Sequence, residues 1–469
     1  MARHVVVIGG GISGLAAAYY LRTGRARVTV LEKAPTVGGL LRVAEVAGLP
    51  VDEGAESLLN RRPEAVDLAA EVGLAADIVY PADVPAGVWS RGEVRPLPDG
   101  TVMGVPGEPA ALSGLFDPAE IGRVAAERRL PQLRVAGDVA IGELVAERMG
   151  DAVVERLVEP LLGGVYAGHA GELSLAATVP ALFAALQRER SLLDGVAAVR
   201  RSTPPAGAPV FAGIRGGVGR LAQAVATASG AEIRTGVTVR GLQVRPTGPG
   251  PRWRIETGPA PHPEYLDADA VVVAVPAAAA ARLLASAAPE ASAALAGVEQ
   301  ASVAIVTLAL PRSAFPQLPA SSGFLVPPVE RRTIKAVTLS SVKWPWLGEL
   351  AGDLVILRAS VGRHRQVQDL QRPDGELVEA VLADLRAALG VRGEPVDARV
   401  SRWGGALPQY AVGHAERVAD IHAAVGNIAG LAVCGATYDG VGVAACVASA
   451  RSAATSLLGE PAIVPPSTV

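Results

Sequence analysis

The amino-acid sequence predicts an α/β fold with α+β character overall, built around a parallel sheet that begins at the N-terminus. A short apolar run over residues 4–8 is followed by a glycine-rich turn over 9–14 and a helix-forming stretch over 15–21. A second apolar run over 28–31 then ends at Glu32. In such a turn the first glycine permits the tight bend, the second lets backbone N–H groups approach a pyrophosphate, and the third lets the helix pack against the strand. Glu32 stands where a carboxylate accepts hydrogen bonds from a ribose, so the sequence predicts a Rossmann-like dinucleotide-binding domain.

Two other interpretations of this N-terminal stretch are weaker. Arg3 and His4 precede an apolar segment, as in a secretory signal peptide. Four glycines, the lack of a small-residue cleavage site and an unbroken run into Glu32 argue against that interpretation. A glycine-rich turn without any ligand is the other alternative. We therefore expect a cytoplasmic, nucleotide-binding protein.

Composition limits the remaining classes. A chain of 469 residues exceeds one hydrophobic core, so two or more domains are expected. Half of the residues are hydrophobic, but no run reaches the ~18 apolar residues that a membrane span needs. The net charge of −3 gives no reason to expect nucleic acid as a partner. Only three of the 43 basic residues are lysine, which we interpret as mutational pressure from a GC-rich genome.

Metal and disulfide chemistry are not indicated. Cys434 and Cys446 form neither a C-x-x-C pair nor a zinc spacing, and the six histidines are scattered. We expect both cysteines to be buried thiols in a reducing compartment, and no metal site.

A second glycine pair, Gly38-Gly39, follows Glu32 closely. NAD-dependent dehydrogenase domains seldom carry such a pair, whereas chains that wrap a whole FAD in extended shape often do. The backbone there has to pass close to the ribityl chain and the flavin ring. An ordinary turn after a strand is the alternative for Gly38-Gly39.

Later segments predict how the domains interleave. Helical periodicity dominates 119–193, strand-like runs and one helix occupy 298–403, and the continuous apolar run 269–276 is typical of a buried parallel strand. The expected division is an FAD-binding domain over 1–85, 196–295 and 416–460, an antiparallel-sheet substrate domain over 86–118 and 296–415, a helical lobe over 119–195, and a disordered tail over 461–469.

The chain closes with a second strand–glycine–helix unit. A strand over 431–434 is followed by Gly435, the run Tyr438–Val443 and a helix over 444–458. The N-terminal end of that helix directs a positive dipole at an anion and would suit the pyrimidine side of a flavin. A helix that merely closes the sheet is the alternative.

Together these motifs resemble the flavin amine oxidase superfamily, whose FAD fold is of the p-hydroxybenzoate hydroxylase type. Within it the chain resembles the porphyrinogen oxidases, and most of all the soluble bacterial type of Gram-positive organisms that acts on coproporphyrinogen III. Membrane-bound protoporphyrinogen oxidases are the next relatives. The stretches that carry the resemblance are 102–106, 157–168, 173–175, 402–403, 408–410, 413–414 and 438–443. One departure is Gly54-Ala55-Glu56-Ser57, where many relatives have Gly-Pro, so cofactor contacts transfer less securely to that turn.

The resemblance implies one non-covalently bound FAD. It assigns cofactor contacts to Gly9, Gly10, Gly11, Ile12, Ser13, Gly14, Glu32, Lys33, Gly39, Leu40, Gly54, Ala55, Glu56, Ser57, Val239, Trp403, Val441, Gly442 and Val443. Val239 could instead be a core strand residue, and Trp403 an anchor at a domain interface.

The resemblance further implies oxygen-consuming, six-electron oxidation of coproporphyrinogen III to coproporphyrin III in haem biosynthesis, with release of hydrogen peroxide. Because the cofactor carries the difficult step, no side chain is nominated as catalytic. Arg42, Arg61 and Arg62 are candidates for binding substrate propionates, with solvated surface arginines as the alternative. Alternative functions are oxidation of protoporphyrinogen IX, amine oxidation, and a non-catalytic carrier of the same fold. Peripheral membrane contact and handover of product to the next haem-pathway enzyme are compatible with this expectation, and the oligomeric state is open.

Overall fold

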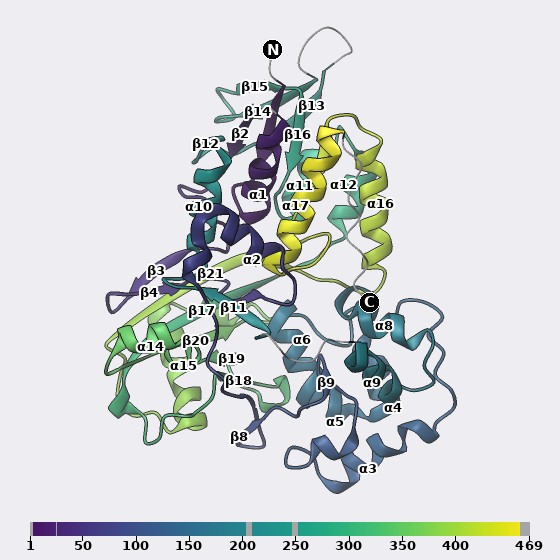
Figure 1. Cartoon of the computed structure of the whole chain (residues 1–469), viewed down its shortest axis with the longest axis vertical. Coiled ribbons are helices and arrows are strands. Elements are labelled where there is room, and N and C mark those ends of the chain that lie inside the picture. Colours follow the sequence, from purple (N-terminus) through teal and green to yellow (C-terminus); the bar gives the residue numbers. More distant parts are fainter. Residues whose placement is uncertain (1–2, 25, 203–208, 246–251, 460–469) are drawn as a thin grey trace.

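The computed structural model describes residues 3–24, 26–202, 209–245 and 252–459, so the expected disordered tail lies outside the described residues. Figure 1 shows a parallel-sheet domain at the top, a second sheet at the lower left and a group of helices at the lower right. The chain passes between these parts several times, because each of the two large sheets contains strands from segments that are far apart in the sequence.

A five-stranded parallel sheet forms the core of the upper domain. Its strands, in spatial order, are β12 (Glu232–Arg234), β2 (Arg27–Leu31), β1 (His4–Ile8), β16 (Ala270–Val273) and β22 (Leu431–Val433). The central strand β1 buries Val5 and Val7 on one face and Val6 and Ile8 on the other. A parallel sheet covered on both faces explains why its strands are apolar throughout.

Helices cover one face of this sheet, and a small antiparallel sheet with further helices covers the other. The first face carries α1 (Ile12–Leu21), α2 (Glu64–Ala69), α10 (Arg220–Ser229) and α17 (Val443–Leu458). The second carries β13 (Gly241–Val244), β14 (Trp253–Thr257), β15 (Glu264–Ala268), α11 (Ala277–Leu284), α12 (Pro289–Ala296) and α16 (His414–Gly426). The α/β fold expected from the sequence is confirmed.

The lower left part is a seven-stranded sheet. Its order is β21 (Asp397–Pro408), β17 (Gln300–Pro311), β20 (Leu354–Val361), β19 (Ile334–Thr338), β18 (Gly323–Leu325), β7 (Ala86–Ser90) and β8 (Glu93–Pro96). All neighbours are antiparallel except β18 and β7, which run parallel. Helix α15 (Asp374–Leu389) packs on the face whose core includes Val306 and Val337.

The helical lobe at the lower right has its own apolar core. It comprises α3 (Pro118–Ala126), α4 (Ile141–Met149), α5 (Asp151–Val153), α6 (Glu159–Tyr166), α7 (Leu175–Thr178), α8 (Pro180–Leu186) and α9 (Leu192–Ser202). Arg148 and Glu127 form a buried ion pair at 2.8 Å inside it. Asp117 and Glu120 form a capping box that begins α3.

Short elements complete the described structure. They are β3 (Val43–Val46), β4 (Leu49–Asp52), β5 (Leu58–Leu59), β6 (Ile78–Val79), β9 (Thr101–Val102), β10 (Val105–Pro106), β11 (Phe211–Ile214), α13 (Ser340–Lys343) and α14 (Pro345–Ala351).

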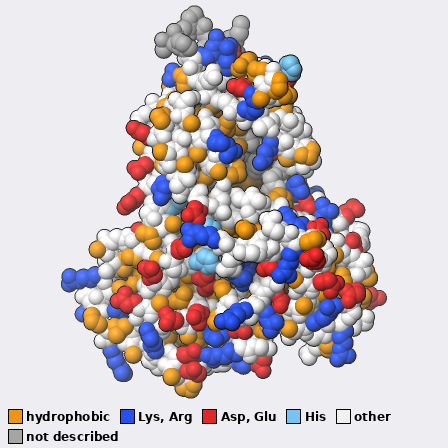
Figure 2. Space-filling view, turned by 180° about the vertical axis from the view of Figure 1, so that it is seen from behind, with side chains coloured by type: hydrophobic (Ala, Val, Ile, Leu, Met, Phe, Trp, Pro, Cys, Tyr) orange, Lys and Arg blue, Asp and Glu red, His pale blue; other side chains and the backbone are white. Residues whose placement is uncertain are grey.

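Two searches of the described residues bear on function. None of the described helices combines the length and the apolar character that a membrane crossing requires. In the same residues no cluster of three or more His, Cys, Asp or Glu side chains could hold a metal ion. On the face shown in Figure 2, basic and acidic side chains are interspersed over the lower part of the molecule, as the net charge of −3 would suggest.

Candidate functional site

The glycine turn between β1 and α1 contains glycines of two kinds. Gly9 has φ +109°, a backbone conformation that favours glycine. A Cβ on Gly14 would overlap the carbonyl oxygen of Gly9, so close packing requires glycine at position 14. Gly11 has an extended backbone with φ −72°, and a Cβ there would meet no atom within 4 Å. Neither backbone conformation nor packing therefore requires glycine at position 11. The open space lies at the first turn of α1, where unpaired N–H groups favour an anion.

Gly442 repeats this arrangement at the other end of the chain. It is the N-cap of α17, has φ −74° and would place a Cβ in open space. Neither α1 nor α17 has a side chain that caps its N-terminus. Because α1 and α17 pack against each other, two uncapped helix starts lie in the same domain. These spaces fit an extended anionic dinucleotide, since a Cβ would fill each of them.

The second glycine pair lies directly beside the first turn. Gly38 N–H donates to the Gly10 carbonyl at 2.8 Å, and a Cβ on Gly39 would lie 3.3 Å from the Gly11 Cα. The Glu32 carboxylate accepts hydrogen bonds from Gly10 N–H at 2.6 Å and from Ala34 N–H at 2.7 Å. The structure thus brings Glu32 and both glycine turns to one place. Lys33 is exposed next to them.

The turn over residues 54–57 is fixed from both sides. A Cβ on Gly54 would overlap the Leu40 carbonyl, and Ala55 N–H donates to that carbonyl at 3.2 Å. The Glu56 carboxylate points away, toward the seven-stranded sheet. A cofactor contact from Glu56 would therefore come from its backbone.

Four side chains surround the Glu56 carboxylate. Arg358 and the Trp344 indole each lie 2.5 Å from it, Ser340 lies at 3.1 Å and Lys343 at 3.5 Å. Burial alone would raise the pKa of Glu56, but Lys343 and Arg358 lower it to about 2. Arg358 also donates to the Gly54 carbonyl, and Lys343 to the Ser57 hydroxyl at 2.7 Å. Through the 54–57 turn, this Glu56 cluster joins the parallel-sheet domain to the part that contains the seven-stranded sheet.

Trp403 and Arg42 lie together around a second buried carboxylate. The Trp403 indole donates to the Glu53 carbonyl at 2.8 Å, and the Arg42 guanidinium lies over the indole at 5.0 Å from its centroid. Arg42 and Arg399 pair with the Glu53 carboxylate at 3.0 and 2.7 Å. Burial of Glu53 opposes ionisation, but the hydrogen bonds from these partners lower its pKa. Arg42 is therefore already paired with an acid.

The remaining predicted residues lie apart from this network. Arg62 pairs with Glu64 at 2.8 Å, while Arg61 is exposed and has no ion pair within the described structure. Val239 is half-buried against the core beneath the parallel sheet, so its two interpretations stay open. Val441 and Val443 flank Gly442 at the start of α17.

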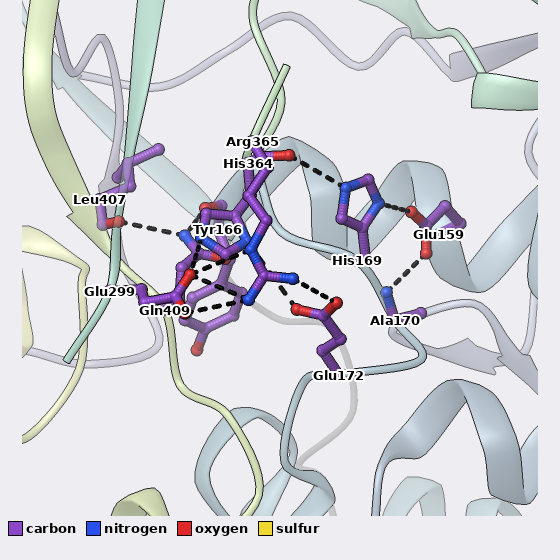
Figure 3. Close-up of polar contacts among 10 residues, drawn as sticks. All are labelled: Glu159, Tyr166, His169, Ala170, Glu172, Glu299, His364, Arg365, Leu407 and Gln409. Carbon is purple, nitrogen blue, oxygen red and sulfur yellow. Dashed lines mark hydrogen bonds and ion pairs between the residues drawn. The ribbon is translucent and has the colours of Figure 1, made fainter. Parts of the chain in front are cut away.

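The motif over 157–168 forms a π-helical turn over 154–158 and α6, which ends at Ala167 with φ +53°. A polar network lies next to this end and is drawn in Figure 3. His169 contacts Glu159 at 3.0 Å through Nδ1 and the His364 carbonyl at 3.1 Å through Nε2. The hydrogen bond to Glu159 raises the pKa of His169. The network thus ties the helical lobe to the seven-stranded sheet.

Ion pairs extend this network to the molecular surface. Arg365 pairs with Glu172 at 2.9 Å and with Glu299 at 3.0 Å, and His364 Nε2 lies 2.8 Å from Glu299. Burial lowers the pKa of His364 despite these acids. Only tertiary structure brings these residues together, and sequence reasoning missed them all. The sole signal was the position of His169 directly after the 157–168 motif.

The sequence also did not predict that Lys335 is buried. Lys335 is 4% exposed and donates from Nζ to the Gly163 carbonyl at 3.2 Å, in the last turn of α6. Burial and the neighbouring Arg363 lower the pKa of Lys335 to about 7. The hydrogen bond from Lys335 to the Gly163 carbonyl satisfies one of the last backbone acceptors of α6.

We expect Gly11→Ala to separate folding from cofactor binding. Its Cβ would lie in open space, so the protein should fold, yet the methyl group would occupy the space at the start of α1. The measurements are far-UV circular dichroism and the visible flavin absorbance of purified protein. Gly122→Ala is the matched control, because a Cβ at this glycine in α3 also meets no atom within 4 Å. A full flavin spectrum in Gly11→Ala would contradict the assignment.

Glu56→Gln should destabilise the protein in a pH-dependent way. It leaves two cations without a buried counter-charge, a change that costs about 3 kcal/mol. The folded pKa of about 2 lies below the ordinary 4.5, so the ionised carboxylate stabilises the fold above pH 4.5, and this contribution disappears as pH falls toward 2. Thermal melts across this range should therefore show the difference between wild type and Glu56→Gln shrinking with acid. Glu232→Gln, at an exposed ion pair, should change little, and a difference that is constant with pH would refute the role of Glu56.

Comparison with known proteins agrees with this geometry. The family model of flavin containing amine oxidoreductases matches residues 12–458. Coproporphyrinogen III oxidase of Mycobacterium tuberculosis is 40% identical over 465 residues, covering 97% of each chain. Coproporphyrinogen III oxidase of Bacillus subtilis is 31% identical over 475 residues, covering 97% of this chain and 98% of its own.

A solved structure extends the likeness to three dimensions. The crystal structure of an Exiguobacterium protein described as a protoporphyrinogen oxidase superposes with a TM-score of 0.85 at 32% identity, covering 98% of this chain and all of its own. The matched span includes both uncapped helix starts, and flavoproteins of this family bind FAD. This chain therefore belongs to the flavin-containing amine oxidoreductases and, within them, to the porphyrinogen oxidase family.

Proposed function

We propose that this protein catalyses the FAD-dependent, oxygen-consuming oxidation of coproporphyrinogen III to coproporphyrin III in haem biosynthesis, a six-electron reaction that releases hydrogen peroxide. The observation that carries the proposal is the pair of open glycines, Gly11 and Gly442, at two helix starts of one FAD domain. The names of the full-length relatives support the choice of substrate.

Residues of the chain have distinct tasks in this proposal. The first turn of α1, with Gly11, binds the pyrophosphate, and the Glu32 carboxylate accepts from the ribose. The 54–57 turn and residues 441–443 face the flavin. The bound FAD supplies the hydride acceptor, and the protein supplies orientation and electrostatics. The Glu56 cluster and the network at the end of α6 keep the domains on either side of the flavin in fixed positions.

Substrate carboxylates call for arginines in this proposal. Coproporphyrinogen III carries four propionates, and a guanidinium binds a carboxylate through two parallel hydrogen bonds. Arg42 already pairs with Glu53 and Arg62 with Glu64, whereas Arg61 has no ion pair in the described structure. Arg61 is therefore the most available of the three candidates. Oxidation of protoporphyrinogen IX is the second candidate reaction, supported by the name of the Exiguobacterium protein.

Coproporphyrinogen III should be oxidised with higher kcat/KM than protoporphyrinogen IX. Protoporphyrinogen IX lacks two of the propionates, and each arginine left without its carboxylate costs on the order of 1–3 kcal/mol. Each lost contact therefore corresponds to roughly tenfold in kcat/KM. Arg61→Ala should lower kcat/KM for coproporphyrinogen III and narrow the gap between the substrates. Porphyrin fluorescence, recorded first without and then with oxygen, measures both reactions. Arg27→Ala is the control, since Arg27 pairs with Glu232 at the far edge of the parallel sheet. A preference for protoporphyrinogen IX, with wild-type behaviour of Arg61→Ala, would refute this specificity.

We further propose a cytoplasmic location, with molecular oxygen as the electron acceptor. The resemblance to the soluble bacterial branch supports it. Any membrane contact would then be peripheral, as would a handover of product to the next haem-pathway enzyme. Cell fractionation should recover the protein in the supernatant, and retention in the membrane pellet through salt and carbonate washes would contradict this location.

A further inference from the structure

The segment Pro408-Gln409-Tyr410 lies where all three parts of the molecule meet. It ends β21 of the seven-stranded sheet, and Gln409 N–H donates to the Glu299 carbonyl at 2.9 Å. On the helical lobe, Ser174 N–H donates to the Tyr410 carbonyl at 2.8 Å. Gln409 and Tyr410 are 6% and 2% exposed. The predicted cofactor and substrate residues do not include either of them.

Gln409 holds the end of α6. Its Nε2 donates to the Tyr166 carbonyl at 2.8 Å and to the Leu407 carbonyl at 3.1 Å, as Figure 3 shows. A Cβ on Gly168 would overlap the Gln409 Oε1 atom, so the side-chain amide lies directly against the backbone that follows α6. The position of the 163–168 segment therefore depends on this amide.

Tyr410 holds the loop that leads into α17. Its hydroxyl donates to the Ala436 carbonyl at 2.6 Å and accepts from Gly440 N–H at 2.8 Å. These two bonds close the backbone between Ala436 and Gly440, just before the open glycine at 442. The Tyr410 ring stacks on His414 at 3.9 Å and contacts the Tyr166 ring at 5.3 Å between centroids. One side chain thus contacts both Tyr166 at the end of α6 and the loop that leads into α17.

Tyr438 provides an internal comparison within the same loop. Its side chain is buried beneath the parallel sheet, in the core that includes Ile421 and Val433. Its hydroxyl has no hydrogen-bond partner in the described structure. Removal of this hydroxyl would break no bond, whereas removal of the Tyr410 hydroxyl would take the partner from two half-buried backbone groups, the Ala436 carbonyl and the Gly440 N–H.

We propose that Gln409 and Tyr410 are positioning residues that set the flavin-facing loop before α17 at a fixed distance from the end of α6. Tyr410 acts on the flavin side through the 436–440 backbone, and Gln409 acts on the α6 side through Tyr166. In this proposal neither side chain contacts the reacting atoms or the cofactor. The expected effect of Gln409 on the KM for coproporphyrinogen III rests on the proposed function, whereas the expected effect of Tyr410 on FAD affinity does not.

The test compares Tyr410→Phe with Tyr438→Phe in the full chain. Apoprotein is titrated with FAD by flavin fluorescence, and visible circular dichroism reports the surroundings of the bound flavin. Tyr410→Phe should raise the FAD Kd about tenfold and change the visible dichroism, because the half-buried backbone groups at Ala436 and Gly440 lose the bonds that fix this loop. Tyr438→Phe should leave both within about twofold. Wild-type FAD affinity and dichroism in Tyr410→Phe, or equal losses in both variants, would overturn the proposal.

Gln409→Met gives a second arm that does not depend on the folding of Tyr410→Phe. It keeps the side-chain length and removes both donated hydrogen bonds. The proposal places the end of α6 on the substrate side of the flavin, so we expect FAD Kd within about twofold of wild type and a several-fold higher KM for coproporphyrinogen III. Unchanged KM, or a rise in FAD Kd as large as that of Tyr410→Phe, would overturn the assignment of Gln409. If wild-type protein did not oxidise coproporphyrinogen III, the proposed function would fail while the FAD measurements on Tyr410 stayed valid.

Discussion

Close packing of α1 against the end of β1 is the constraint on which the rest of the structure depends. The packing is achieved because Gly14 has no side chain and its Cα lies against the Gly9 carbonyl. With α1 in this position, its uncapped N-terminus opens beside Glu32, and the backbone at Gly38 can bond to Gly10. The location of the proposed cofactor space therefore follows from one contact between Gly9 and Gly14.

The second requirement is that separate domains stay aligned on either side of that space. Buried charges meet it at Glu56, whose carboxylate pairs with Arg358 from β20 of the seven-stranded sheet and with Lys343 from α13. A buried ion pair contributes little net stability when compared with apolar packing, but loss of one partner is expensive. Such a pair therefore specifies one relative position of the domains more strongly than it stabilises them. The carbonyl of Gly54 belongs to the same cluster, so domain position and the shape of the 54–57 turn are coupled.

Local patterns predicted most of the fold. The glycine turn, the apolar strand β16 and helix α17 all appear where periodicity and turn chemistry indicated, although β16 ends at Val273 and Pro276 precedes helix α11. The parallel pairing of β7 with β18 did not follow from either strand, since strand direction in a sheet depends on partners more than 200 residues away. The site shows the same division. Gly11, Gly442 and Glu32 carry a local signature, whereas His169, His364 and Lys335 gain their partners only through tertiary contacts. Arg42 was predicted to bind substrate, but in the structure its guanidinium forms an ion pair with Glu53, and no pattern in the sequence indicated this pair.

The order in which strands enter the parallel sheet has a consequence for biosynthesis. Strand β1 is made long before its neighbour β16 and the outer strand β22, which come from residues 270–273 and 431–433. Helix α17, which packs on α1, is made later than both of these strands. During translation the edge of β1 that later pairs with β16 therefore stays unpaired until residues 270–273 have been made. An unpaired apolar strand edge favours chaperone binding and aggregation. The proposed FAD site, which uses the starts of α1 and α17, is complete only after α17 has been made.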